Sequence, residues 1–321
     1  MIWFFILIFA ICCVLLYFSG EWIVGGLMRI ARFLGWREFV VAFFVMAFAA
    51  SLPNLFIGIT SALKGTPQLS FGDVAGNNII ALTLAVALAV LFAKGKAIPA
   101  ESRTVQATSI FTIAAALLPL FLIFDAELSR LDGLLLIGFF AFYLFWLFRK
   151  KERFTKVYDN HKTPFIKELK TFFKDIGKLV LGIILLVISA QGIVASAQFF
   201  ALTFNVPIVL IGLLITGFGS ALPEVYFSVV SAKRDETWMI LGNLMGAVIV
   251  PATLVLGIVS LISPIEILDF TPLIIARIFL IISALFFFFF VRTDRQITKR
   301  EAFFLVLILL AAAILTIFIK G

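Results

Sequence analysis

An internal repeat constrains this chain more than any other feature of its sequence. Residues 48–84 return, without a gap and 170 positions later, as residues 218–254, with ten identities among thirty-seven aligned pairs. The retained pairs are mostly small or helix-breaking residues and include Leu52-Pro53 with Leu222-Pro223, Gly72 with Gly242, and Gly76 with Gly246. Paired segments interrupted by Gly and Pro in the two halves of a membrane protein are typical of transporters and indicate where the substrate binds. We therefore expect the functional site in these two segments, the first and second repeat copies.

The composition places the chain in a membrane. Of its 321 residues, 63% are hydrophobic and 14% are charged, which excludes a soluble globular domain. An apolar run of about 20 residues is long enough to cross a bilayer as a helix. Ten such runs occur, at residues 2–19, 38–64, 71–93, 104–124, 132–149, 177–199, 207–232, 238–262, 271–292 and 302–319. We expect an all-α polytopic membrane protein with ten transmembrane helices. The first run has no basic start and no small-residue cleavage site, so we expect it to be a retained span.

The positions of the basic residues predict the orientation. When successive loops are assigned to alternate sides, one side holds 22 Lys and Arg residues, and the other holds only Lys64, Arg130 and Lys320. The positive-inside rule then places both termini outside, and we expect the cytoplasmic membrane of a prokaryote. This distribution accounts for the net charge of +8 without a nucleic-acid partner. The expected partners are the lipid bilayer and inorganic cations, and the expected state is a monomer or weak oligomer.

A single long polar stretch divides the chain into two halves. Residues 1–149 form an N-terminal half of five spans, residues 150–176 a basic cytoplasmic linker, and residues 177–321 a C-terminal half of five spans. Given the predicted orientation, the first copy begins inside and the second outside, so the halves are two inverted five-helix repeats. Inverted repeats are related by an axis in the membrane plane, and their equivalent motifs meet at mid-depth.

Proline and glycine lie at the middle of the span that opens each copy. Pro53 and Pro223 each lack an N–H and disturb a carbonyl about one turn earlier, and Gly217 and Gly219 loosen the second copy further. We expect a helix break at both places. Freed carbonyls at membrane depth are tolerated only where protein or a water-lined cavity satisfies them, and a dehydrated cation is one natural partner. A kink needed only for packing is the alternative interpretation.

Glu224 is the strongest single candidate for a cation ligand. It is the only acid deep inside a predicted span, whereas the others lie in loops or near span ends. A carboxylate at mid-membrane is costly unless it is paired or coordinated, so by default it indicates an ion or proton site. The alternative is a protonated carboxyl that is hydrogen-bonded within the bundle. Asn54 occupies the equivalent position of the first copy and offers a neutral oxygen ligand.

Further oxygen donors lie near these two positions in the sequence. The predicted cation-binding set is Glu224, Asn54, Ser51, Ser220 and Asn77, with Asn78 and Asp73 as secondary candidates. Asp73 shares a helical face with Asn77 at a spacing of four, although an ordinary helix N-terminal acid is the other interpretation. Asn78 is rotated by about 100° from Asn77 and suits packing or hydrogen bonding between helices. Close helix packing is predicted at the glycines of both copies, namely Gly72, Gly76, Gly242 and Gly246.

Both copies resemble a known family. The stretches AASLPNLFIGITSALKG…LSFGDVAGNNI and GFGSALPEVYFSVVSAKRDE…MILGNLMGAVI are similar to the two alpha-repeats of the cation/calcium antiporter superfamily, which includes sodium/calcium exchangers. The resemblance implies a secondary-active antiporter with alternating access, in which Ca²⁺ or another cation is exchanged against Na⁺ or H⁺ at a midplane site. It implies no enzyme activity and no cofactor apart from the transported cations.

Departures from the family pattern leave the transported ion open. Family members usually place Glu after Leu-Pro in both copies, but the first copy has Asn54 there, and Asn77 and Ala247 replace the Ser of Gly-Ser-Asn. A site with one carboxylate compensates Ca²⁺ poorly, because Ca²⁺ usually binds more than one. A monovalent-cation exchanger, and a transport-inactive protein that acts as an ion sensor or partner subunit, are therefore the alternatives.

Overall fold

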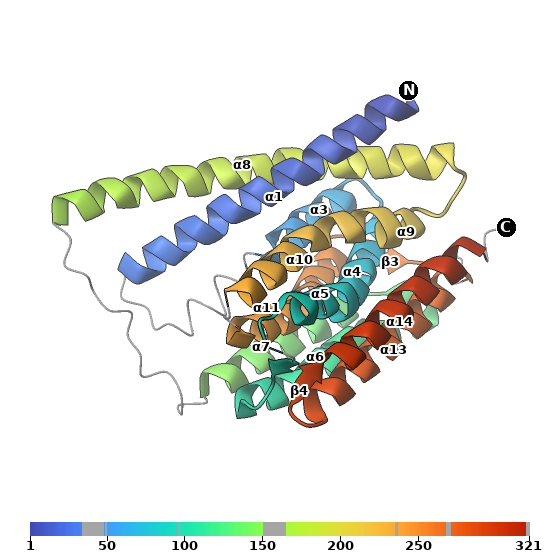
Figure 1. Ribbon diagram of the computed structural model, residues 1–321. Helices are drawn as coiled ribbons and strands as arrows, with labels where there is room; N and C mark the ends of the chain where they lie inside the picture. The colour runs from blue at the N-terminus through green and yellow to red at the C-terminus, as the bar shows by residue number, and fades with distance from the viewer. Residues whose placement is uncertain are drawn as a thin grey trace.

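The computed structural model of the chain is built almost entirely from helices (Figure 1). It describes residues 1–33, 48, 50–95, 97–149, 165–234, 237–267 and 271–318. The α-helices are α1 Ile2–Phe33, α3 Leu52–Leu63, α4 Gln68–Ile80, α5 Val86–Phe92, α6 Arg103–Leu122, α7 Arg130–Arg149, α8 Phe165–Thr203, α9 Ile208–Ile211, α10 Gly217–Lys233, α11 Thr237–Ile249, α12 Leu256–Ile262, α13 Thr271–Arg292 and α14 Lys299–Phe318. Three π-helical segments, η2 Ala81–Ala85, η4 Gly212–Thr216 and η5 Val250–Val255, and one short 3₁₀ turn, η3 Ile123–Asp125, continue some of them.

The helices follow the ten predicted apolar runs. Within the described part of the chain, eight helical stretches are long and apolar enough to cross a membrane. The run at 38–64 is represented by α3, a shorter apolar helix of 12 residues, because residues 34–47 and 49 lie outside the described residues. The run at 302–319 is represented by α14, which has 20 residues. The predicted linker at 150–176 lies mostly outside the described residues, although α8 already begins at Phe165.

Two short antiparallel strand pairs, which the sequence did not predict, join loops at the ends of the bundle. β1 Ala97–Pro99 pairs with β4 Gln296–Thr298, and β2 Glu127–Leu128 pairs with β3 Ile265–Glu266. Loops can pair only if they lie at the same end of a helix bundle. Each pair joins two loops that the charge pattern assigns to the same side, β1 and β4 to the basic side and β2 and β3 to the other. The strand pairs are therefore consistent with the alternation of sides used for the orientation.

The two longest helices lie together at one side of the molecule (Figure 1). α1 has 32 residues and α8 has 39, and they pack along each other. Two glycines of α8 allow this approach, since a Cβ added at Gly182 would lie 2.8 Å from the Ile23 side chain, and one added at Gly192 would overlap Cys12 Sγ. These helices are the first spans of the two halves, and they cover α3 and α10, which carry the repeat motifs.

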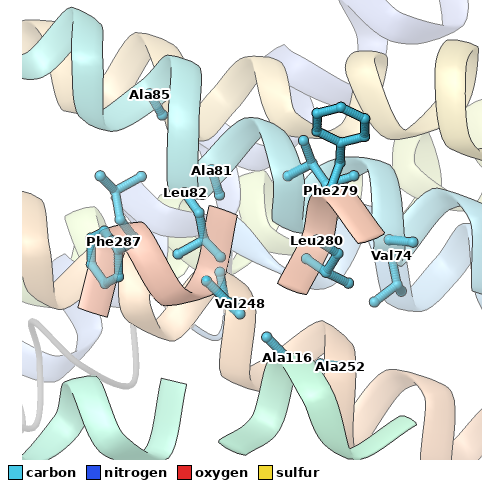
Figure 2. Close-up of a cluster of buried hydrophobic side chains, with 14 of the residues drawn as sticks. Val74, Ala81, Leu82, Ala85, Ala116, Val248, Ala252, Phe279, Leu280 and Phe287 are labelled. Carbon is cyan, nitrogen blue, oxygen red and sulfur yellow. The ribbon is translucent and has the colours of Figure 1, made fainter. Parts of the chain in front are cut away.

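The largest apolar cluster among the described buried residues contains side chains from both halves (Figure 2). It includes Leu82 of η2, Val248 of α11, and Phe279 and Phe287 of α13, all nearly or fully buried. Side chains from both repeat copies therefore share one core. The motif helices contribute to this core, and α1 and α8 cover α3 and α10.

The described parts of the two repeat copies share two local features, a π-helical segment and a threonine hydrogen bond. In both, a helix that carries the Leu-Pro motif is followed by a helix that changes to π-helical winding near its centre, at η2 and at η5. Thr83 donates its hydroxyl to the Ile79 carbonyl at 2.5 Å, and Thr253, 170 positions later, donates to the Ile249 carbonyl at 2.6 Å. Short π-helical segments inside α-helices are frequent at functional sites.

The structure differs from the predicted helix breaks in the second copy. Pro53 is the second residue of α3, two positions after the N-cap residue Ser51, where a missing N–H leaves no helical hydrogen bond unmade. By contrast, Pro223, Gly217 and Gly219 all lie within the continuous helix α10, and the irregular winding is in η4, just before Gly217. A helix in this bundle accommodates the proline because local π-helical winding and neighbouring helices can satisfy the freed backbone groups.

Candidate cation site

Asp73 lies at the centre of a buried hydrogen-bond cluster between the two repeat copies. Asn54 Nδ2 donates to Asp73 Oδ2 at 3.0 Å, and Ser220 Oγ donates to Asp73 Oδ1 at 3.0 Å. Asn54 Nδ2 also donates to Ser220 Oγ at 3.1 Å. The three side chains are fully buried and come from α4, α3 and α10. The cluster therefore joins the halves through polar contacts to one carboxylate.

Asp73 is buried more deeply than its predicted place near the end of a span. The sequence ranked Asp73 second, with an ordinary N-terminal acid as the other interpretation. Asp73 is the sixth residue of α4, which begins at Gln68, so it lies beyond the first turn where the helix dipole favours acids. Asp73 and Glu224 are thus two acids with no exposed surface, and they lie on α4 and α10, which pack against each other.

Glu224 is fully buried, with no exposed surface. Both of its carboxylate oxygens lack a hydrogen-bond partner among the described residues. The alternative of a protonated carboxyl that is hydrogen-bonded within the bundle stays a prediction, because residues 34–47 and 49 lie outside the described residues. Buried polar atoms are nearly always hydrogen-bonded, and an exception calls for an explanation such as a bound ion. The cost of an uncompensated buried carboxylate makes a cation or a proton the natural partner of Glu224.

Three amide oxygens are also free among the described residues. Asn54 and Asn77 use their amide nitrogens as donors, the second to the Ala247 carbonyl at 3.3 Å, and their Oδ1 atoms have no partner, nor has Oδ1 of Asn78. All three side chains are at least 99% buried. An amide oxygen can only accept a hydrogen bond, and the same is true of an ionised carboxylate. The free atoms at Glu224, Asn54 and Asn77 are therefore all acceptors, which suits a hard cation.

The hydrogen bond from Asn77 to Ala247 marks the symmetry axis. These two residues occupy equivalent positions of the two copies, 170 apart. Equivalent residues of two repeats can touch only close to the axis that relates the repeats. The site therefore lies where inverted repeats place it, at their mutual centre. Ser51, the last predicted ligand, is buried at the start of α3, three residues before Asn54.

Glycines bring the backbones of α4 and α10 into direct contact at this centre. A Cβ added at Gly217 would lie 2.9 Å from the Asp73 carbonyl oxygen, 2.9 Å from Gly76 Cα and 3.0 Å from the Asn77 nitrogen. A Cβ at Gly72 would overlap the Val209 carbonyl oxygen of α9 and would lie 2.9 Å from the Leu213 nitrogen of η4, and one at Gly76 would overlap the Leu213 carbonyl oxygen. The predicted packing role of Gly72 and Gly76 is therefore visible in the structure, and Gly217 joins it.

The glycines of the second copy stay a prediction. The repeat would place Gly242 and Gly246 against residues 42–47, the equivalents of 212–217, and these lie outside the described residues. Around Gly242, no atom of the described chain lies within 4 Å of an added Cβ.

Comparison with known proteins shows which family the chain belongs to. Residues 4–149 and 174–318 match the model of a family described as sodium/calcium exchanger protein. The chain belongs to the sodium/calcium exchanger family. A relative in this family is the sodium/calcium exchanger MaX1 of Methanosarcina acetivorans, 25% identical over 298 residues that cover 80% of this chain and 84% of MaX1. Another relative is the inner membrane protein YrbG of Escherichia coli, 24% identical over 259 residues that cover 79% and 78%.

A solved exchanger has the same fold. The sodium-calcium exchanger NCX_Mj, in crystals soaked with Na⁺ and Sr²⁺, superimposes with a TM-score of 0.67 at 24% identity, over 98% of this chain and 99% of that chain. The predicted fold, an all-α membrane protein with ten helices in two inverted repeats, is confirmed. The chain is an integral membrane cation antiporter of the sodium/calcium exchanger family and not an enzyme.

Proposed function

We propose that this exchanger family member moves Ca²⁺ across the membrane in exchange for Na⁺ or H⁺, and that the ions bind in turn between α3, α4 and α10. The observation that carries the proposal is the Glu224 carboxylate, which is fully buried and lacks a hydrogen bond among the described residues. Asp73, Asn54, Asn77 and Ser220 supply the remaining ligands. MaX1, a sodium/calcium exchanger, supports the choice of ions.

The charge of the site supports a divalent ion. Ca²⁺ binds six to eight oxygens and usually more than one carboxylate. Asp73 and Glu224 supply two carboxylates, Asn54 and Asn77 two amide oxygens, and Ser220 a hydroxyl that already lies 3.0 Å from Asp73. Two negative charges balance one Ca²⁺ in a region where Coulomb interactions are only weakly screened. With two carboxylates, the proposed site meets the preference of Ca²⁺ for more than one carboxylate, which a single acid would not.

The same charges favour exchange over one-way transport. Two buried carboxylates without a counter-ion are costly in a membrane, so the empty site is unfavourable. Ca²⁺ neutralises both, and so do Na⁺ ions or protons. Since both kinds of ion need the same oxygens, one kind has to leave before the other binds. Alternation of the two repeats about this site then couples the two fluxes.

The experiment is ion uptake by purified protein in liposomes. We expect uptake of radioactive Ca²⁺ when a Na⁺ or H⁺ gradient is imposed, and we expect Glu224→Gln to abolish it. A matched control is Glu301→Gln, because Glu301 accepts hydrogen bonds from Thr298 outside the site and a capping position of this kind accepts Gln as well as Glu. Uptake that survives Glu224→Gln would refute the site.

Two further outcomes would select the alternatives. Exchange of Na⁺, K⁺ or Li⁺ without any Ca²⁺ flux would indicate a monovalent-cation exchanger. No flux with any pair of cations, together with a cation-dependent shift in melting temperature, would indicate an ion sensor or partner subunit. The charge distribution also leads us to propose that both termini face outside, which protease accessibility in oriented vesicles tests.

A further inference from the structure

The internal repeat relates the polar residues of the site crosswise. With the offset of 170, Asn54 corresponds to Glu224, and Asp73 corresponds to Asn243. Each copy therefore holds one carboxylate and one amide at these two positions, but in exchanged order. Asn243 was not among the predicted ligands, and the signal that would have found it is its equivalence to Asp73.

In the first copy, the amide and the carboxylate are hydrogen-bonded to each other. Asn54 and Asp73 are fully buried on α3 and α4, which pack against each other. Their side chains are joined by a hydrogen bond of 3.0 Å from the amide nitrogen to the carboxylate. The amide thus orients the carboxylate and leaves its own Oδ1 free.

The second copy also holds one carboxylate and one amide, but no hydrogen bond joins them. Glu224 and Asn243 are 0% and 5% exposed, and they lie on α10 and α11, which also pack against each other. Among the described residues, the Glu224 oxygens and the Asn243 amide nitrogen all lack a hydrogen-bond partner. A buried amide donor without an acceptor is costly, and Glu224 offers two free acceptors.

The symmetry axis places Asn243 with Glu224. Asn77 and Ala247 meet at the axis. Asp73 precedes Asn77 by four residues, and Asn243 precedes Ala247 by four, so each lies one helical turn away on the same face. Because the repeats are inverted, these turns lie on opposite sides of the axis. Asn243 thus occupies, on the Glu224 side, the place that Asp73 occupies on the Asn54 side.

We infer that Asn243 belongs to the cation site, where its amide nitrogen is a donor available to Glu224. The two copies then form complementary carboxylate–amide pairs, and their two negative charges set the preference for a divalent ion. The inference rests on the proposed function. It states that the site requires one carboxylate in each copy and accepts it at either of the two positions. The residue types at positions 54 and 73 are then interchangeable.

The test is an interchange of side chains that differ only by an oxygen and an NH₂ group. Asp73→Asn leaves one carboxylate in the site and Asn54→Asp creates three, with two of them in direct contact. The double variant Asn54→Asp/Asp73→Asn restores two, with the hydrogen bond between the pair reversed in direction. We expect each single variant to weaken Ca²⁺-driven thermal stabilisation and Ca²⁺ uptake by more than about tenfold. We expect the double variant to recover both to within about threefold of the unaltered protein.

The second copy allows an independent version of this interchange test. Glu224→Gln/Asn243→Asp again leaves one carboxylate and one amide in the copy, and we expect it to recover Ca²⁺ binding that Glu224→Gln loses. Asp132→Asn is the control for a carboxylate-to-amide change outside the site, since Asp132 accepts hydrogen bonds from Ser129 at the start of α7.

The outcomes separate this inference from the proposed function. If the unaltered protein exchanges Ca²⁺ but neither folded double variant improves on its single variant, the inference is overturned and the proposed function stands. If the unaltered protein binds and exchanges no Ca²⁺, the proposed function falls, and the statement about a divalent ion falls with it. Thermal melting and size-exclusion profiles identify any variant that has not folded, and the other copy's double variant then decides.

Discussion

Replacing Gly217 by Ala tests how the site is assembled. The added Cβ would meet three backbone atoms of α4, the Asp73 oxygen at 2.9 Å, Gly76 Cα at 2.9 Å and the Asn77 nitrogen at 3.0 Å. Non-bonded carbon contacts are favourable at about 3.5–4.0 Å. Backbone atoms inside a helix cannot rotate away as a side chain would. The two helices therefore have to separate by roughly 0.5–1 Å.

The separation acts on the hydrogen bond between Ser220 and Asp73. Ser220 follows Gly217 by three residues on α10, and its Oγ lies 3.0 Å from Asp73 Oδ1. A separation of roughly 0.5–1 Å takes this distance beyond the range of a hydrogen bond. Overpacking costs about 1–3 kcal/mol, and a hydrogen bond to a charged group contributes about 1.5–3 kcal/mol. We therefore expect Gly217→Ala to lower the free energy of unfolding by about 3–5 kcal/mol in total.

The assay is thermal melting of the purified protein with and without Ca²⁺. We expect Gly217→Ala to lower the melting temperature by about 5–10 °C and to reduce the stabilisation that Ca²⁺ provides. Gly138→Ala is the control, because an added Cβ at this glycine of α7 meets no atom of the described chain within 4 Å. If Gly217→Ala melted like Gly138→Ala and kept its response to Ca²⁺, the close backbone contact would be refuted.

Three further substitutions separate the site from the rest of the bundle. Ser220→Ala removes the hydroxyl that donates to Asp73, and we expect Ca²⁺ affinity, measured by thermal-shift titration, to fall about 10- to 100-fold; an unchanged titration would contradict the cluster. Asn77→Ala removes a free amide oxygen and the bond to Ala247, so we expect both a lower melting temperature, from a loss of about 1–3 kcal/mol, and weaker Ca²⁺ binding. A loss of stability alone would exclude Asn77 from the ligands. Gln106→Ala removes two hydrogen bonds of 2.8 and 2.7 Å to backbone carbonyls at the end of the bundle; we expect lower stability by about 1–3 kcal/mol with unchanged Ca²⁺ affinity, and a change in affinity would show that these loops are coupled to the site.

The sequence predicts the spans, the inversion and the location of the site. Apolar runs and basic loops are properties of long segments, so small errors at their edges do not change the topology. The offset of 170 then identifies equivalent motifs, and two of the predicted ligands, Asn54 and Ser220, are hydrogen-bonded to each other across the copies.

The depth of Asp73 in the bundle could not be predicted from the sequence. Hydropathy places the start of its span near residue 71, which makes Asp73 an end residue, whereas α4 begins at Gln68 and crosses η4 at Gly72. Depth in the bundle depends on where neighbouring helices cross, and that is a tertiary property. The same holds for Pro223, which the sequence treats as a helix breaker but which lies inside the continuous helix α10, while the irregular winding is in η4.

Anomalous diffraction from crystals soaked with Ca²⁺ would locate the bound ion. We expect one strong peak in the centre of the bundle, with oxygens of Glu224 and Asp73 and the amide oxygen of Asn54 about 2.3–2.6 Å away. Crystals of the Glu224→Gln variant should lose this peak. A Ca²⁺ ion bound elsewhere at saturating Ca²⁺, with no density beside Glu224, would refute the proposed site.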